Sequence, residues 1–172
     1  FGHGVIRVLP AQATGLDIEM DIEQARTGSP VILSAIRTDV LGNSGEIILP
    51  LSNWTVPTGS LAMDGDSVSW TPSRIGNWTI GVSDQGFSAT MQVSVTQGLI
   101  VGINVLLSEE NLQSGDSIIA SISAYDAAGN HRSVEGEWTI APELGAEDKG
   151  GWTQLKPGPI GEYSISATWF DN

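Results

Sequence analysis

Two Gly-Asp-Ser triplets carry the residue types that a serine-based reaction would use, at Gly65-Asp66-Ser67 and at Gly115-Asp116-Ser117. A serine nucleophile needs a histidine base that a carboxylate orients. Neither His3 nor His131, the two histidines of the chain, has an aspartate three residues earlier. Glycine, aspartate and serine also favour turns. We therefore predict turns at both triplets and a protein that is not an enzyme.

Carboxylates in predicted turns are the residues that could bind a metal ion, and calcium is the ion that suits them. Ca²⁺ takes about six to eight oxygen ligands, many of them from Asp and Glu. The candidates are Asp64 and Asp66, on either side of a glycine, and Asp126, which opens a turn that ends in Gly129-Asn130. These residues form only part of a calcium-binding loop. We predict no cofactor other than this candidate calcium.

Two N-glycosylation sequons occur, Asn53-Trp54-Thr55 and Asn77-Trp78-Thr79. In a strand, neighbouring side chains point to opposite faces, so a Trp that points inward leaves its Asn outward. Asn53 and Asn77 are therefore candidate glycosylation sites if the cell that secretes the protein glycosylates it.

Six tryptophans suggest a carbohydrate-binding surface, because sugars stack on exposed aromatic rings. Three aromatic pairs recur when the chain is aligned on itself: Trp54 with Trp138, Trp70 roughly with Trp152, and Trp78 with Tyr163. Repetition at equivalent strand positions is typical of core packing. Trp169 aligns instead with Asp84, so it is the candidate for a binding or inter-domain contact.

The charge balance excludes several classes of function. The 172 residues include 20 Asp+Glu, 7 Lys+Arg and no cysteine, for a net charge of -13. Nucleic acids and anionic membrane surfaces are themselves negative, so we expect neither as a partner. The sequence contains no apolar stretch long enough for a membrane span. The missing cysteines exclude disulfides and thiolate metal sites.

The elements that position these residues come as an internal repeat. Residues 27–43 align without a gap on residues 114–130, at an offset of 87, and residues 75–80 align on 160–165, at an offset of 85. Loops vary in length more readily than strands, which accounts for the small drift. The repeat of about 85 residues has the size of one small all-β domain.

Each repeat is predicted to consist of short strands. Residues 16–23 alternate between apolar and acidic side chains, which predicts a strand with one face in water. Val31, Leu33 and Ala35 likewise share one face of the next strand. Because no long segment has the apolar periodicity of a helix, the predicted fold class is all-β, with two tandem immunoglobulin-like β-sandwiches.

Three segments of the second repeat carry a resemblance to a known family: Tyr125-Asp126-Ala127-Ala128-Gly129-Asn130, Glu137-Trp138-Thr139-Ile140, and residues 161–167. They resemble the bacterial and archaeal immunoglobulin-like repeat domains of surface proteins, including the invasin and intimin group. The first repeat has the same skeleton, except for a longer stretch between Asn43 and Trp54. The resemblance implies an extracellular spacer, adhesin or surface-layer segment.

The repeat also predicts the domain boundaries. Residues 16–98 form the first sandwich and residues 99–172 the second, which lacks its last strand by this alignment. Residues 1–15 contain an extra strand and a linker, with Val5, Ile6, Val8 and Leu9 as a candidate donor strand. Two interpretations are open. Either the ends are boundaries within a longer array, or the extra strand of one molecule completes the second sandwich of another.

We therefore expect an extracellular, non-enzymatic cell-surface repeat protein that acts as a structural spacer, an adhesin or part of a surface layer. One alternative is a filament subunit that polymerises by strand donation. Another is a carbohydrate-binding accessory module of a secreted enzyme. The expected partners are neighbouring repeats or copies of the same chain, together with surface glycans or a host or partner protein.

Overall fold

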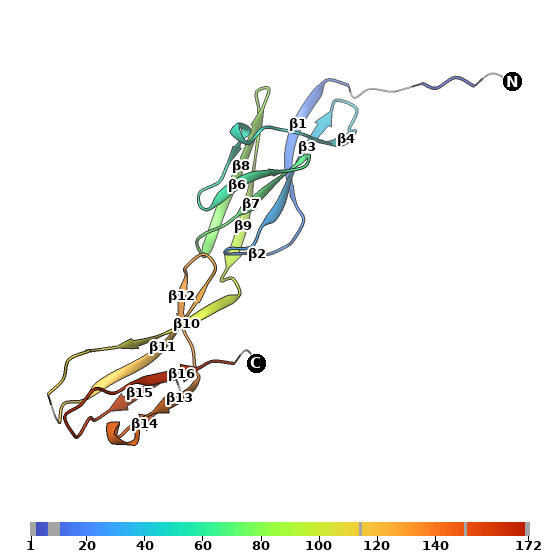
Figure 1. Cartoon of the computed structure of the whole chain (residues 1–172). Helices are drawn as coiled ribbons and strands as arrows, with labels where there is room; N and C mark the ends of the chain where they lie inside the picture. The colour runs from blue at the N-terminus through green and yellow to red at the C-terminus, as the bar shows by residue number, and fades with distance from the viewer. Residues whose placement is uncertain (1–2, 7–10, 114, 150, 171–172) are drawn as a thin grey trace. The chain divides into compact units, whose positions relative to one another are not determined.

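The computed structural model describes residues 3–6, 11–113, 115–149 and 151–170, and it divides the chain into two compact units, residues 1–98 and 99–172. Each unit is described here by itself. Strands make up nearly all the regular structure of these residues, with two short 3-10 turns, η1 (Leu51–Asn53) and η2 (Pro142–Leu144) (Figure 1). The predicted all-β fold class is confirmed. In the described ranges, no helix has the length and apolar character that crossing a membrane requires.

Unit 1 consists of two sheets. The first has the order β1-β3-β7-β6, with β4 also paired to β3: β1 (Ala13–Met20), β3 (Val31–Asp39), β4 (Ser44–Ile47), β6 (Ser60–Asp64) and β7 (Ser67–Thr71). The second has the order β2-β9-β8-β5: β2 (Ala25–Arg26), β5 (Trp54–Thr55), β8 (Gly76–Asp84) and β9 (Phe87–Thr96). Strand β9 lies between β8, to which it is antiparallel, and β2, to which it is parallel.

The core of unit 1 lies between these sheets. Val31, Leu33 and Ala35 of β3 are almost fully buried, as the alternation predicts, and they belong to one apolar cluster with Trp70 and Val95. The alternating pattern at residues 16–23 forms a strand only as far as Met20. At Asp21 the carboxylate accepts a hydrogen bond from the backbone N–H of Ile32 (2.9 Å), the strand ends, and Ile22 is exposed.

Unit 2 also consists of two sheets. One has the order β10-β11-β15-β14, with β12 also paired to β11: β10 (Ile100–Leu107), β11 (Ile118–Asp126), β12 (His131–Ser133), β14 (Glu147–Asp148) and β15 (Trp152–Leu155). The other contains β13 (Glu137–Ile140) and β16 (Ile165–Thr168). Strand β10 pairs with β11 in the register of β1 with β3, with a bulge at the equivalent place.

The strand pairing corrects one aromatic equivalence. Trp70 lies opposite Val31 in unit 1, and Leu155 lies opposite Ile118 in unit 2. Leu155 therefore takes the buried position of Trp70. Trp152 is not its counterpart and is 41% exposed. The alignment failed here because it matched residue type, whereas the sheet matches register.

Two buried tryptophans of unit 1 differ in one hydrogen bond. The Nε1–H of Trp70 donates to the carbonyl of Thr58 (2.8 Å), whereas Nε1 of Trp54 is buried without a hydrogen-bond partner among the described residues. Trp→Phe substitutions at the two positions remove a similar apolar volume. Only the substitution at Trp70 also removes a hydrogen bond.

We expect Trp70→Phe to lower the free energy of unfolding by about 1 kcal/mol more than Trp54→Phe, because it also leaves a buried carbonyl unsatisfied. Urea unfolding of the full chain, followed by circular dichroism, measures the difference. An equal or larger loss for Trp54→Phe would contradict this account.

Candidate functional site

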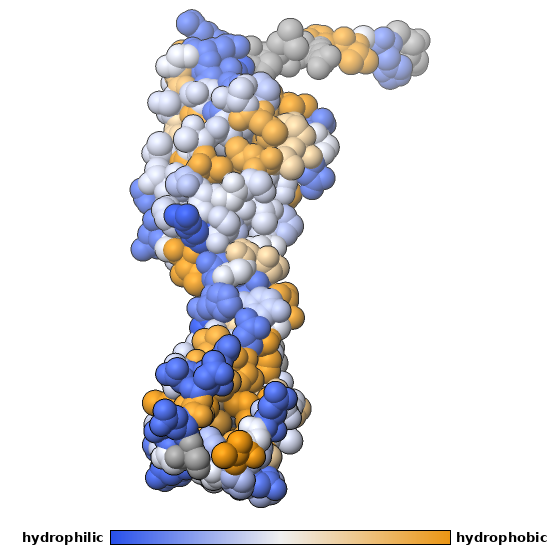
Figure 2. All heavy atoms as spheres, turned by 60° about the vertical axis from the view of Figure 1, so that its left-hand side comes forward, coloured by the Kyte–Doolittle hydropathy of each residue, from blue (hydrophilic) through white to orange (hydrophobic). Residues whose placement is uncertain are grey.

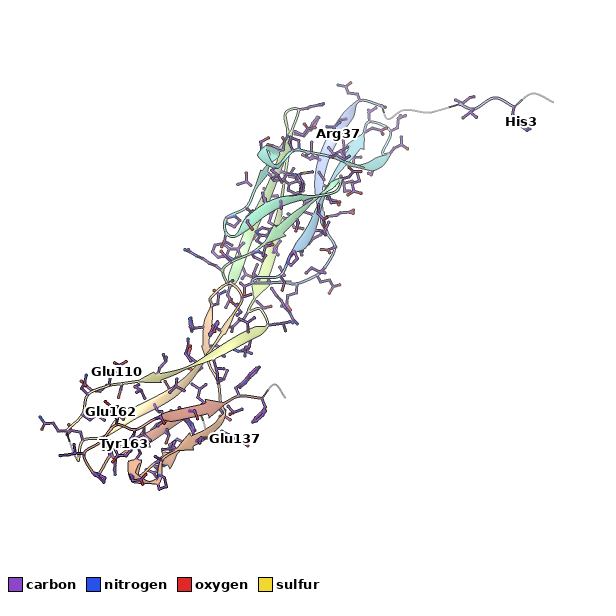
Figure 3. All side chains as sticks on the ribbon, viewed as in Figure 1. His3, Arg37, Glu110, Glu137, Glu162 and Tyr163 are labelled. Atoms are coloured by element: carbon purple, nitrogen blue, oxygen red, sulfur yellow. The ribbon has the colours of Figure 1, made fainter. Side chains whose placement is uncertain are left out.

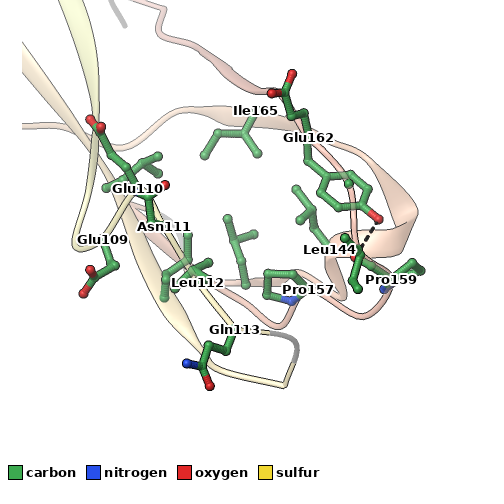
Figure 4. Close-up of a pocket in the computed structure, with 16 residues that line it drawn as sticks. Glu109, Glu110, Asn111, Leu112, Gln113, Leu144, Pro157, Pro159, Glu162 and Ile165 are labelled. Carbon is green, nitrogen blue, oxygen red and sulfur yellow. Dashed lines mark hydrogen bonds between the residues drawn. The ribbon is translucent and has the colours of Figure 1, made fainter.

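Unit 2 contains a pocket of about 580 Å³ at one end of its sandwich. Figure 4 shows its walls: the segment from Glu109 to Gln113 after β10, and the segment from Pro159 to Tyr163 before β16. Ile118, Leu144 and Leu155 from the core contribute apolar lining. The pocket thus borders the hydrophobic core, although these three residues themselves stay buried.

The same place in unit 1 is filled by the end of strand β9. Val95 lies opposite Gly76 of β8 on one side and opposite Ala25 of β2 on the other. Val93, two residues earlier, lies opposite Trp78. Both valines are almost fully buried, so β9 closes the apolar core of unit 1 at this end.

The two walls of the pocket are the unit 2 counterparts of β2 and β8. At the offset of 87, Ala25 corresponds to Leu112, and at the offset of 85, residues 76–80 correspond to 161–165. Strand β16 pairs with β13 as β8 pairs with β5: Trp138 faces Ala167 as Trp54 faces Val82. In the described part of unit 2, no strand pairs with the other edge of β16. The pocket therefore lies where a further strand could pair, and we call it the open strand position.

The open strand position leaves apolar side chains in contact with solvent. The cluster of buried residues contains Ile118, Ala120, Leu144 and Leu155, far fewer than its counterpart in unit 1. Ile160, at the mouth, is 98% exposed. On the face drawn in Figure 2, apolar side chains of unit 2 (orange) are visible beside charged ones (blue).

The charge at the open strand position is negative. Glu109, Glu110 and Glu162 belong to its lining and are exposed, and its lining contains no lysine or arginine. In Figure 3, Glu110 and Glu162 come from the two opposite walls. The combination of an apolar floor with acidic walls suits an extended segment that carries a cation among apolar residues.

One wall is shaped by an aromatic ring that folds back on its own chain. Tyr163 lies over Gly161, and its hydroxyl donates to the carbonyl of Pro159 (3.1 Å). Trp78 of unit 1 lies over Gly76 in the same way and donates from Nε1 to the carbonyl of Arg74 (2.9 Å). This wall of unit 2 therefore has the local structure that accompanies a paired β9 in unit 1.

A second feature occurs in both units: an aspartate carboxylate accepts hydrogen bonds in the turn after the central strand. Asp39 Oδ1 accepts hydrogen bonds from the backbone N–H groups of Leu41 and Asn43 (both 2.9 Å), and Oδ2 accepts one from the backbone N–H of Ala11 (3.0 Å). In unit 2, Asp126 Oδ1 accepts from the corresponding N–H groups of Ala128 and Asn130 (both 2.9 Å). The side-chain amide of each Asn also donates to the carboxylate. Both carboxylates are buried, so they serve to fix the turn.

These contacts bear on the calcium candidates. The Asp126 carboxylate is occupied by N–H donors, whereas Asp64 and Asp66 lie exposed at the β6–β7 turn. Among the residues that the structure describes, no group of three or more His, Cys, Asp or Glu side chains could hold a metal ion. The structure does not bring the three candidates into one site.

The two sequon asparagines differ in their surroundings. Asn77 is exposed on β8, but the Asn53 side-chain amide donates to the carbonyl of Ser83 (2.6 Å). Trp54 is buried and Trp78 half-buried, so the sequence pattern places the aromatic rings inward. Asn77 is thus the more accessible of the two sites.

Trp169 follows β16 and is half-buried. Its counterpart in unit 1, Asp84, forms an ion pair with Arg37, which connects the two sheets. At the offset of 87, Arg37 corresponds to Ala124. Unit 2 therefore has an alanine and a tryptophan where unit 1 has an ion pair, and no described contact of Trp169 identifies a ligand.

The structure also contains a Ser–His contact that the sequence did not reveal. His131 Nδ1 lies 3.1 Å from Ser123 Oγ, across strands β11 and β12. Ser123 is buried, so a substrate could not approach its hydroxyl. The described histidine that contacts a serine is His131, and its partner is Ser123, not Ser67 or Ser117; His3 is exposed before β1. The donor candidates Val5 and Ile6 are exposed and extended, while Val8 and Leu9 lie outside the described residues.

No protein-family model and no curated protein sequence matches this chain. Among solved structures, the S-layer protein SbsC is 15% identical with a TM-score of 0.36, over 93% of this chain and 26% of that one. A crystal structure of SbsC domains 4 and 5 is 16% identical with a TM-score of 0.37, over 92% of this chain and 94% of that one. The Escherichia coli adhesin FdeC is 14% identical with a TM-score of 0.41, over 89% of this chain and 57% of that one. These values are too low to transfer a function.

The turn of unit 1 predicts a dependence of stability on pH. The hydrogen bond from the Asn43 side chain, with those from the backbone of Ala11, Asn43 and Leu41, lowers the pKa of Asp39 to about 2. A carboxyl whose pKa is lower in the folded state stabilises the fold when ionised. Its contribution is complete above its ordinary pKa of about 4 and is lost as the pH falls towards 2.

We therefore expect Asp39→Asn to lower stability at neutral pH and to flatten the loss of stability between about pH 4 and pH 2. Thermal unfolding at a series of pH values measures this slope. Asp66→Asn, which removes the same charge from an exposed turn, is the matched control and should leave the slope unchanged. An unchanged slope in Asp39→Asn would show that the turn carboxylate does not carry the effect.

Proposed function

We propose that this chain is a non-enzymatic segment of an extracellular cell-surface protein, where it acts as a structural spacer, as an adhesin segment or as part of a surface layer. The observation that carries the proposal is the repetition of one structural unit with its specific polar contacts. Asp39 and Asp126 fix equivalent turns, and β1 and β10 enter their sheets in the same register. Units that repeat in this way build length and present surfaces at regular intervals.

The distribution of charge supports a surface role. Exposed carboxylates occur in both units, for example Glu19 and Asp66 in unit 1 and Glu110 and Glu137 in unit 2, and the net charge is -13. A high net charge of one sign spread over the surface keeps a protein soluble and hydrated. The same spread does not concentrate carboxylates at one catalytic centre.

Labelling of intact cells tests the proposed location. We expect an antibody raised against the chain to stain the cells that produce it without permeabilisation, and external protease to remove the signal. A cytosolic protein probed in parallel controls for lysis. Staining that requires permeabilisation would reject the proposal.

A second candidate, carbohydrate binding, is favoured by one observation: Trp152 on β15 is 41% exposed. Exposed tryptophans provide the flat apolar face on which a sugar ring stacks. Its equivalence to the buried Trp70 was the sequence argument for core packing, and the strand register removes that argument.

If this candidate function holds, Trp152→Ala should weaken glycan-array binding by at least about fivefold, since one aromatic–ligand contact contributes about 1 kcal/mol or more. Trp169→Ala tests the half-buried Trp169 in the same assay. Absence of glycan binding by the unaltered chain would eliminate this candidate.

A further inference from the structure

We propose that the open strand position of unit 2 binds residues 5–9 of a second copy of this chain as an added β-strand, so that the chain assembles head to tail. Addition of a strand to a free sheet edge is a general mode of recognition, in which backbone hydrogen bonds provide affinity and alternate side chains fill pockets. The inference goes beyond the surface role and does not depend on it, because the same contact would form in any compartment.

The repeat assigns residues 5–9 to the same sequence position as the end of β9. The offset of 87 relates β1 to β10 by their pairing partners, since Ala13 faces Asp39 as Ile100 faces Asp126. Applied to residues 92–96, which precede β10, this offset gives residues 5–9, which precede β1. Ile6 and Val8 then correspond to Val93 and Val95, and they retain the apolar character of those positions.

The pairing of β9 in unit 1 fixes the expected register in unit 2. Val95 faces Gly76 and Ala25, so Val8 is expected to face Gly161 and to lie beside Leu112. Val93 faces Trp78, so Ile6 is expected to face Tyr163. Ile6 and Val8 would cover the apolar floor that the pocket leaves open.

The charge of the segment matches the walls of the site. Arg7 takes the place of Ser94, which faces Asn77 in unit 1, and the counterpart of Asn77 is Glu162. Opposite charges that face each other across antiparallel strands stabilise the pair. The single cation of the segment therefore meets a glutamate, in a chain whose net charge of -13 otherwise opposes self-association.

Val5 and Ile6, the described residues of the donor segment, are accessible and belong to unit 1, whereas the acceptor belongs to unit 2. Val5 and Ile6 are 97% and 90% exposed and belong to no strand. They precede Ala13, at the end of β1, whereas Arg26 and Thr96 pair at the other end of unit 1, just before the link to unit 2. Each copy can therefore donate one strand and accept another. Such contacts between unlike surfaces produce open chains of subunits unless they close into a ring.

The association state of the full chain tests the proposal. We expect light scattering after size exclusion to show species heavier than the 18.1 kDa monomer that grow with concentration, and negative-stain images to show linear or ring-shaped assemblies. Val8→Asp should reduce the association constant by at least about a hundredfold without altering the unfolding of either unit. A monodisperse monomer at the highest concentration reached would overturn the proposal.

Charge reversal tests the register. Arg7→Glu and Glu162→Arg should each weaken association about threefold to tenfold, and the double variant should restore it. Glu137→Arg, at an exposed position on β13, changes the same charge away from the site and is the control. If the double variant associates no better than the single ones, the proposed register is wrong.

Peptide binding distinguishes residues 5–9 from other strands that could occupy the open strand position. The Val8→Asp chain keeps its acceptor site, so a synthetic peptide of residues 3–10 should bind to it at one per chain by calorimetry, and the same peptide with Val8→Asp should not. Binding of a peptide of residues 87–97 but not of residues 3–10 would show that the site takes a strand other than the one we propose, and would overturn the assignment. Failure of both peptides would overturn it as well.

Discussion

Strand β9 is the element on which the packing of unit 1 depends, because it pairs on both edges and also covers the core. It joins β8 to β2 and buries Val93 and Val95 between them. Burial of one such side chain contributes about 1.5–3 kcal/mol, which is a large part of the few kcal/mol by which a small domain is stable. The same position in the described part of unit 2 has both walls and the floor but no strand.

The local polar contacts of unit 1 recur in unit 2 more closely than the apolar packing of its core does. In both turns the backbone N–H groups two and four residues after the aspartate donate to its carboxylate, and Trp78 and Tyr163 fold over equivalent glycines. These contacts are local, since each joins residues a few positions apart, so they form whether or not β9 has a counterpart. The consequence is that the wall beside Gly161 is shaped before any strand binds. A preformed wall reduces the ordering that binding must impose.

The sequence predicted the strands and turns well, but it did not predict which strands lie side by side. Alternation placed Val31, Leu33 and Ala35 in the core, and the repeat predicted the equivalent turns at Asp39 and Asp126. Periodicity reports which face a residue occupies, but it does not report which strand lies beside it. Trp152 was therefore matched to the wrong residue.

The repeat predicted that the second sandwich lacks its last strand, but not which segments border that position. The walls of the open strand position come from segments about fifty residues apart, near Leu112 and near Gly161, which adjoin strands of two different sheets. The contact between Ser123 and His131 also depends on cross-strand register, which no motif in the sequence encodes. The sequence does show that the buried positions of Val93 and Val95 correspond, at the offset of 87, to the apolar residues Ile6 and Val8.

Affinity and register at the open strand position have different physical origins. Burial of Ile6 and Val8 would contribute about 3–6 kcal/mol in total, whereas a cross-strand ion pair between Arg7 and Glu162 contributes about 0.2–1 kcal/mol. The apolar residues therefore dominate binding, but they do not select one alignment, because Val5 and Leu9 are apolar as well. A slip by one residue exchanges the two faces of a strand. That slip would turn Arg7 into the apolar floor, where an unpaired charge costs several kcal/mol, so the arginine excludes the wrong register more strongly than it stabilises the right one.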